Sequence, residues 1–261
     1  MTGCARGSRG VDQSMMPASS HAHEPALLVT RDGRVTVITL NRPETGNYID
    51  RAVAKELTRA LDEAETDREI NSVVLTASGE RFCSGIDPGE AGADDLERQV
   101  LVRALFARCW TKPIVAAVSG DAIGGGLELV LMVDVVVAAE HARFALPQVT
   151  TGALADMGGA FRLPAQLPKK VAIQMLLTGE HITGRRAYEL GLVSRLEAAS
   201  NVLASALDLA RAIAALPPRA VQASKRVAGG IEDGLAPTEA PLWRLLFAES
   251  ETLTHVVPSQ T

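Results

Sequence analysis

Three polar side chains in the middle of the chain have the types and spacing needed to take part in catalysis, either by transferring a proton or by holding a water. Glu128 follows a run of three glycines in an otherwise apolar segment, and Gln148 and Asp156 lie eight residues apart in ALPQVTTGALADMGG, residues 145–159. A carboxylate in apolar surroundings has a raised pKa and is suited to proton transfer near neutral pH. Glu128 is therefore the first candidate for an acid–base residue. The alternative is a glutamate that only compensates the dipole at a helix N-terminus.

Two glycine-containing turns each follow a buried strand. GERFCSGID (residues 79–87) follows SVVLTA, and SGDAIGGGLE (residues 119–128) follows PIVAAV. Parallel strands end at the same edge of a sheet, where open α/β sheets bind ligands. Two N–H groups that converge from such turns would stabilise an oxyanion. The alternative is that the glycines only permit tight packing of a helix on a strand.

The elements that must position these residues alternate between strand and helix. The pattern predicts a hairpin over residues 27–40 around Asp32-Gly33, buried strands at 72–77, 113–118 and 135–139, and helices at 50–65, 96–110 and 127–132. This order is typical of β–α–β units with parallel strands. From Gly158 onward the pattern becomes helical, with an extended piece at 192–196; helices are expected near 169–177, 184–190, 198–216, 218–228 and 238–250.

Composition excludes several classes of protein. With 261 residues, of which 47% are hydrophobic, the chain can bury a large core. A net charge of −5 and 3% aromatic residues argue against nucleic acid as a partner. The most apolar run, residues 127–139, is too short to cross a bilayer and contains two acids, so no membrane partner is expected.

The spacing of cysteines and histidines indicates the redox state of the thiols and whether a metal site is expected. Cys4, Cys83 and Cys109 form no C-x-x-C pair, which favours reduced thiols and a cytoplasmic location. The five histidines form no H-E-x-x-H pattern, so no metal site is expected. The first residues contain no apolar stretch of signal-peptide length and are interpreted as a mobile tail.

Four ordered segments resemble a known family. RFCSGID, KPIVAAVSGDAIGGGLEL, ALPQVTTGALADMGGAFRLP and LLTGEHITGRRAYELGLVSRL are similar, in order and spacing, to the crotonase family of enoyl-CoA hydratases and isomerases. FALP and RLPAQLP look most like its carnitinyl-CoA dehydratase branch. The likeness covers about residues 27–241.

The resemblance implies an α/β, crotonase-like (ClpP/crotonase) fold of repeated β-β-α units with a helical C-terminal trimerisation region. On this basis we expect a mobile tail over residues 1–25, an α/β core over 26–196 and a C-terminal helical region over 197–261. The resemblance also implies a homotrimer or a dimer of trimers.

The resemblance further implies a CoA thioester as the substrate, with no separate cofactor, in fatty acid metabolism. By position, the N–H groups of Ser84 and Gly125 would form the oxyanion hole, and Ser84, Ile86 and Gly125 would bind the substrate. The shared chemistry is stabilisation of a thioester enolate.

The family's hydratases use two glutamates, of which the first matches Glu128. Where the second would stand, this chain has Gln148, which can hold a water but does not exchange a proton near neutral pH. Asp156 matches the position at which relatives that isomerise dienoyl-CoA have an aspartate, and it is equally suited to cap a helix. The first prediction is an enoyl-CoA hydratase or dehydratase, a lyase. The alternatives are an enoyl-CoA or dienoyl-CoA isomerase using Glu128 and Asp156, or a non-catalytic acyl-CoA-binding homologue.

Overall fold

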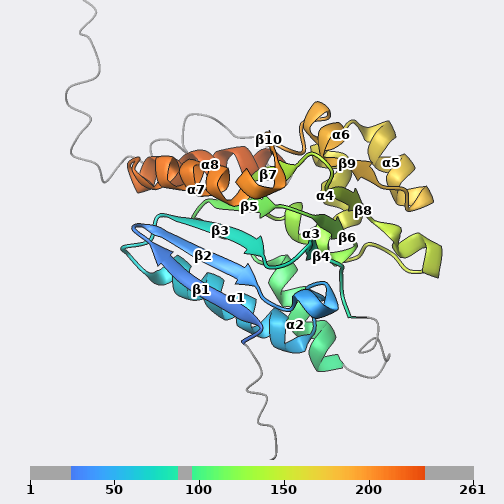
Figure 1. The fold of residues 1–261 in the computed structure, drawn as a ribbon, viewed down its shortest axis with the longest axis horizontal. Helices are drawn as coiled ribbons and strands as arrows, with labels where there is room; N and C mark the ends of the chain where they lie inside the picture. Colours follow the sequence, from blue (N-terminus) through green and yellow to red (C-terminus); the bar gives the residue numbers. More distant parts are fainter. Residues whose placement is uncertain (1–24, 88–95, 233–261) are drawn as a thin grey trace, which may run out of the picture.

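A six-stranded sheet forms the centre of the fold. The structure is a computed structural model that describes residues 25–87 and 96–232 (Figure 1). The strands stand in the order β1 (Leu27–Asp32), β2 (Val35–Leu40), β3 (Ser72–Ala77), β5 (Ile114–Val118), β7 (Val135–Ala139) and β10 (Arg195–Glu197). β1 and β2 are antiparallel and the other neighbours are parallel, which confirms the predicted hairpin and the parallel strands.

The strands of a second, smaller sheet were not located by the residue pattern, although the repeated β-β-α units implied by the resemblance include them. This sheet consists of β4 (Arg81–Cys83), β6 (Asp121–Ile123), β8 (Arg143–Ala145) and β9 (Ile182–Thr183), in that order. β4, β6 and β8 each follow a strand of the large sheet, which produces the repeated β-β-α arrangement. Strands of two or three residues are too short to show an alternating pattern in the sequence.

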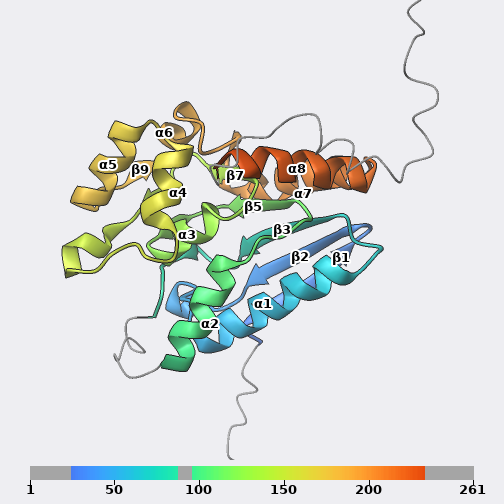
Figure 2. The same cartoon turned by 180° about the vertical axis from the view of Figure 1, so that it is seen from behind.

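Helices cover both faces of the large sheet. Figures 1 and 2 show α1 (Arg51–Thr66) and α2 (Leu96–Ala107) on one side, and α7 (Val202–Ala214) and α8 (Pro218–Glu232) on the other. α7 packs against β3, β5 and β7. The remaining elements, beside the small sheet or joining strands, are η1 (Pro43–Thr45), α3 (Gly125–Val130), η2 (Pro147–Thr151), α4 (Gly159–Gln166), α5 (Lys169–Thr178), α6 (Gly184–Glu189) and η3 (Ala199–Asn201).

Most predicted helices are present with shifted ends. α1 begins where predicted because the Asp50 side chain accepts a hydrogen bond from the Val53 N–H at 2.7 Å. α2 ends three residues earlier than predicted, and α3 begins two residues earlier. α4, with Pro164 in its interior, was missing from the predicted helices. The predicted helix at 238–250 and nearly all of the predicted tail lie outside the described residues.

The core is almost entirely apolar. Its largest fully buried side chains include Phe82, Phe144 and Leu127 from the small sheet and α3. Cys83 is also buried, and burial raises the pKa of its thiol to about 12, so it packs as a neutral side chain. Among the few buried charged residues is Glu128.

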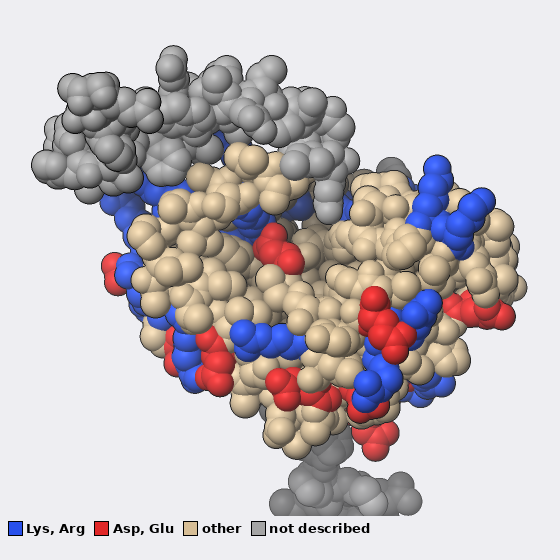
Figure 3. All heavy atoms as spheres, turned by 90° about the horizontal axis from the view of Figure 1, so that it is seen from above, with Lys and Arg blue, Asp and Glu red and all other residues tan. Residues whose placement is uncertain are grey.

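The surface gives two further observations. Lys and Arg are intermixed with Asp and Glu on the face seen in Figure 3. Among residues 25–87 and 96–232 no single helix is long and apolar enough to cross a membrane; Ala199–Ala214 and Pro218–Gly229 pass that test only as a pair bent by 110°.

Asn47 fastens the first glycine turn to the fold. Its Oδ1 accepts the Arg42 N–H at 2.8 Å, and its Nδ2 donates to the carbonyls of Ser78 (2.9 Å) and Arg81 (2.8 Å) on either side of the β3–β4 turn. Its φ of 58° lies in the left-handed region, which asparagine tolerates better than most residues. Asn47 therefore fixes the position of the β3–β4 turn and of the glycine-containing segment that follows β4.

Replacing Asn47 with alanine should destabilise the protein. Asn47→Ala leaves two carbonyls without their donor and keeps an unfavourable φ, so we expect the free energy of unfolding to fall by about 2 kcal/mol. Urea unfolding measures this. Asn201→Ala, at an exposed position, should change it by less than about 0.5 kcal/mol. Equal effects of the two substitutions would contradict the role given to Asn47.

Candidate active site

The two glycine turns meet at one edge of the sheets, as predicted. β4 and β6 are parallel neighbours. A Cβ atom on Gly85 would lie 3.5 Å from the Gly125 nitrogen, and one on Gly125 would lie 3.3 Å from the Ile86 nitrogen. The absence of side chains at Gly85 and Gly125 therefore brings the N–H groups of Ile86 and Gly125 close together.

The prediction that Ser84 provides an oxyanion N–H does not fit this geometry. The Ser84 N–H donates to the Gly46 carbonyl at 2.9 Å and is not free. Residue 49 pairs with residue 86: the Ile49 N–H donates to Gly85 O and the Asp87 N–H donates to Ile49 O. This pairing leaves the Ile86 N–H unused. Within the described residues, neither Ile86 nor Gly125 has a hydrogen-bond acceptor for its N–H.

The glycine run of residues 124–126 serves both purposes considered from the sequence. A Cβ on Gly126 would lie 2.2 Å from Cys83 O, so this glycine is needed for α3 to pack on β4. Gly125, in contrast, is the first residue of α3 and presents its N–H beside that of Ile86. Tight packing and a pair of free donors therefore come from neighbouring residues.

The Glu128 carboxylate is buried and held at one oxygen. Its residue is 1% exposed. Oε1 accepts the N–H groups of Met157 and Gly159, both at 2.9 Å, and Oε2 accepts Gln148 Nε2 at 3.3 Å. A Cβ on Gly159 would lie 3.0 Å from Oε1 and 2.9 Å from Leu146 Cδ1, a closeness that glycine accommodates without displacing either side chain. Glu128 thus faces the turn before α4. The alternative that it only compensates the dipole of α3 does not account for these contacts.

Burial raises the pKa of Glu128 to about 7. The hydrogen bonds from Gly159 and Met157 act against this rise because they favour the ionised form. The Asp156 charge raises the pKa further, and the Arg162 charge lowers it. Near neutral pH the carboxyl is therefore present in both forms, as a group that takes and returns protons requires.

Gln148 lies beside Glu128, and its side chain uses only the amide nitrogen in a hydrogen bond within the described residues. It stands in η2, and its Nε2 donates to Glu128 Oε2. Its Oε1 is buried and has no partner within the described residues. This oxygen can accept a hydrogen bond from a hydroxyl or a water molecule.

Asp156 is not a helix cap, which corrects one of the two interpretations of this residue. The N-cap of α4 is Gly158, with no side-chain cap bond. The N–H groups that Asp156 was expected to satisfy donate to Glu128 instead. The Asp156 carboxylate is 38% exposed and forms an ion pair with Arg103 Nη2 of α2 at 2.5 Å. Asp156 thus lies next to the Glu128 anchor, and its charge is matched by an arginine.

Sequence reasoning missed two arginines around this turn. Arg103 pairs with Asp156, and Arg162 donates to the carbonyls of Met157 (3.3 Å) and Phe106 (2.8 Å). Nothing in the sequence pairs α2 with α4, so these contacts had no local signal. The one indication was a cation, Arg162, inside the mostly apolar segment GGAFRLP.

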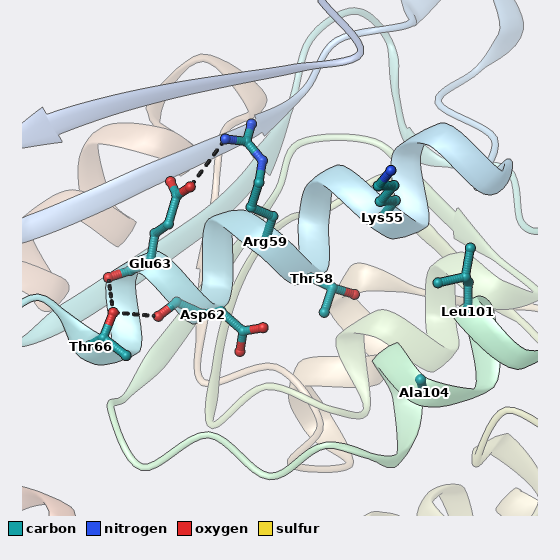
Figure 4. Close-up of a pocket in the computed structure, with 8 residues that line it drawn as sticks. All are labelled: Lys55, Thr58, Arg59, Asp62, Glu63, Thr66, Leu101 and Ala104. Carbon is teal, nitrogen blue, oxygen red and sulfur yellow. Dashed lines mark hydrogen bonds and ion pairs between the residues drawn. The ribbon is translucent and has the colours of Figure 1, made fainter.

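A groove elsewhere on the molecule takes no part in this site. It has a volume of about 370 Å³ and lies between α1 and α2 (Figure 4). Two of its charged residues pair with each other, Arg59 with Glu63 at 3.1 Å. None of the predicted site residues borders it; its lining consists of Lys55, Thr58, Arg59, Asp62, Glu63, Thr66, Leu101 and Ala104.

Comparison with known proteins decides the family. Residues 30–236 match the family described as enoyl-CoA hydratase/isomerase. The chain belongs to this family. It is 38% identical to 2,3-dehydroadipyl-CoA hydratase of Escherichia coli (strain K12), covering 86% of this chain and 91% of that protein. It is 36% identical to the carnitinyl-CoA dehydratase of Salmonella arizonae, covering 77% and 79%.

Solved structures agree with this assignment. A carnitinyl-CoA dehydratase from Mycobacterium avium 104 is 43% identical, with a TM-score of 0.74 over 87% of this chain and 89% of that one. An enoyl-CoA hydratase from Geobacillus kaustophilus has a TM-score of 0.79 at 30% identity, over 85% and 90%. The crotonase resemblance and the predicted fold are confirmed, and the protein is an enzyme of the enoyl-CoA hydratase/isomerase family.

The raised pKa of Glu128 should make stability depend on pH. The ordinary pKa is 4.5 and the folded value is about 7, so between these pH values the folded state binds more protons than the unfolded one. The free energy of unfolding should therefore fall as the pH rises through this range, by at most about 3 kcal/mol. Urea unfolding at pH 5 and pH 8 measures the change.

Glu128→Gln should lose this pH-dependent term. The free energy of unfolding of the variant minus that of the wild type should therefore be larger at pH 8 than at pH 5. Glu69→Gln, at an exposed position, serves as the control. If both variants follow the wild-type pH dependence, Glu128 does not titrate in this range.

Proposed function

We propose that the protein is an enoyl-CoA hydratase or dehydratase with Glu128 as its one acid–base residue. The main support is a single observation: a buried carboxylate with a pKa of about 7, anchored at Oε1, in the same site as two unused N–H groups. The hydratase and dehydratase names of the relatives support the reaction class. Because a CoA thioester is the substrate, no separate cofactor is proposed.

The N–H groups of Ile86 and Gly125 are proposed to hold the thioester carbonyl oxygen. Their nitrogens lie on the two sides of the contact between Gly85 and Gly125. As the thioester becomes an enolate, negative charge develops on this oxygen, and both donors interact more strongly. Loss of one such donor typically costs about 2.7–4 kcal/mol of transition-state stabilisation.

The proton steps require only Glu128. In dehydration, the Glu128 carboxylate takes the α-proton of a 3-hydroxyacyl-CoA, and the enolate expels the β-hydroxyl group. The same carboxyl group returns the proton to the leaving oxygen, which departs as water, so the products are 2-enoyl-CoA and water. Hydration is the reverse. Gln148 Oε1 accepts a hydrogen bond from the hydroxyl or water and does not itself exchange a proton.

A double-bond isomerase using Glu128 and Asp156 is less well supported. The Asp156 carboxylate is 38% exposed and is occupied by its ion pair with Arg103. The named relatives are hydratases and dehydratases. The third alternative, a binding protein without chemistry, would leave the pKa and anchoring of Glu128 without a purpose.

The proposal extends to assembly and location. We propose a homotrimer or a dimer of trimers, as the family resemblance implies. Exposed apolar side chains available for its contacts stand on several helices and turns, among them Leu154, Phe161 and Leu177 between η2 and the end of α5, and Leu203 and Leu216 near α7. A cytoplasmic setting fits Cys83 and Cys109, which are both free thiols.

Hydration of crotonyl-CoA tests the reaction directly. Wild-type protein should reduce the absorbance of the conjugated thioester, and Glu128→Gln should lower the rate by about 10²–10⁴-fold because it removes the proton-transfer group. Gln148→Ala should lower it less, by about tenfold, since it removes the water-holding oxygen and the hydrogen bond to Glu128 Oε2 but keeps the proton-transfer group. Glu69→Gln is the matched control.

Asp156→Asn separates the hydratase from the isomerase. We expect it to keep the hydration rate within about threefold, because the charge it removes only modulates Glu128. Loss of activity in Asp156→Asn would favour the isomerase pairing. A third experiment incubates the protein with acyl-CoA in deuterated water. If no deuterium enters the α-carbon in a Glu128-dependent way, the result would favour the binding protein.

Light scattering after gel filtration tests the trimer. The expected mass is three times that of the chain, or six times for a dimer of trimers. Leu177→Asp, at a residue that is 70% exposed, should dissociate the assembly if α5 forms the contact. Leu216→Asp should do so if the predicted C-terminal helical region forms it. A monomeric wild type would contradict the proposal.

A further inference from the structure

The turn over residues 156–159 is bonded on two sides. On one side, the N–H groups of Met157 and Gly159 hold Glu128 Oε1. On the other side, Arg162 Nη1 donates to the Met157 carbonyl at 3.3 Å, and Nη2 donates to the Phe106 carbonyl at 2.8 Å. Phe106 stands in the last turn of α2. One guanidinium therefore joins the end of α2 to the Met157–Gly158 peptide, which lies between the two peptides whose N–H groups hold the Glu128 carboxylate.

Two successive glycines make this arrangement possible. A Cβ on Gly158, whose φ is +114°, would lie 2.3 Å from Arg162 Nη1 and 3.1 Å from its Cζ. A Cβ on Gly159 would lie 3.0 Å from Glu128 Oε1. Gly158 thus makes room for the guanidinium, and Gly159 makes room for the carboxylate. The turn is shaped to receive both side chains at once.

We infer that Arg162 is a positioning residue for Glu128, because it fixes the turn whose Met157 and Gly159 N–H groups hold the carboxylate. The inference rests on the proposed function for the catalytic role of Glu128. No contact between Arg162 and the reacting atoms is part of the argument. An arginine suits this task because its planar fork donates in two directions at once, which a lysine cannot do with the same geometry.

The charges around Glu128 determine what removing Arg162 should do. α3 packs against β4, β6 and α4. β4 contains Arg81 and the neutral thiol of Cys83, and β6 contains Asp121, which pairs with Arg143 at 2.5 Å. Asp156 and Arg162 are the charged groups that shift the pKa of Glu128, in opposite directions. Without Arg162, Glu128 faces Asp156 and a looser anchor, so its pKa should rise.

The test measures the titration of Glu128 itself. In protein labelled with ¹³C at the glutamate carboxyls, the Glu128 resonance is the one that Glu128→Gln lacks. We expect Arg162→Gln to raise its midpoint by about one pH unit. The dehydration kcat at pH 7 should fall about fivefold or more and recover only in part as the pH rises, because a higher pH restores the ionised carboxylate but not its anchor. KM should stay within about twofold of the wild-type value. Arg162→Lys should restore the midpoint because it keeps the charge, while kcat stays low.

Arg185→Gln is the matched control, since Arg185 is an exposed arginine paired with Glu140 outside the site. A Glu128 midpoint in Arg162→Gln equal to that of the wild type would overturn the inference. Should Arg162→Gln not fold, a wild-type kcat in Arg162→Lys would overturn the two-carbonyl bridge. The titration needs no turnover, so an inactive wild type would refute the proposed function and leave this test intact.

Discussion

The site depends on one interaction, the pair of N–H groups that hold Glu128 Oε1. An ionised carboxylate loses its hydration when it is buried, and the loss must be offset by hydrogen bonds or by charge. Here two backbone donors supply part of that compensation, and the pKa stays near 7 because burial still outweighs them. More donors would lower the pKa of Glu128 and favour its ionised form, and fewer would raise it and favour the neutral form.

This interaction determines where glycine must stand. The donors belong to a turn 29 to 31 residues after Glu128, and Gly159 allows them to reach Oε1 because it has no side chain there. On the other side of the site, Gly85 and Gly125 allow the Ile86 and Gly125 nitrogens to approach each other. The short strands β4 and β6 hold these loops in register. Glycine therefore permits a close approach at both ends of the site, of backbone to backbone at Gly85 and Gly125 and of backbone to carboxylate at Gly159.

The sequence was sufficient for features with a local signal. Hydrophobic patterns located the strands of the large sheet and most helices, and the acid in an apolar helix identified Glu128. Contacts between residues far apart in the sequence could not be predicted. Choosing Ser84 failed because its N–H is taken by Gly46, and the cap interpretation of Asp156 failed because Glu128 takes the N–H groups that a cap would use. Arg103 and Arg162 likewise act across elements that no sequence pattern joins.

Gln148 has a stereochemical consequence under the proposed function. A second glutamate there would place two carboxylates in contact, and one would have to remain protonated or lie apart. The amide instead donates to Glu128 Oε2 and leaves Oε1 of Gln148 as an acceptor. With one carboxyl group making both proton transfers, the α-hydrogen and the β-oxygen must both face Glu128. The two groups are then removed from the same face of the acyl chain, and water adds to that same face in the reverse reaction.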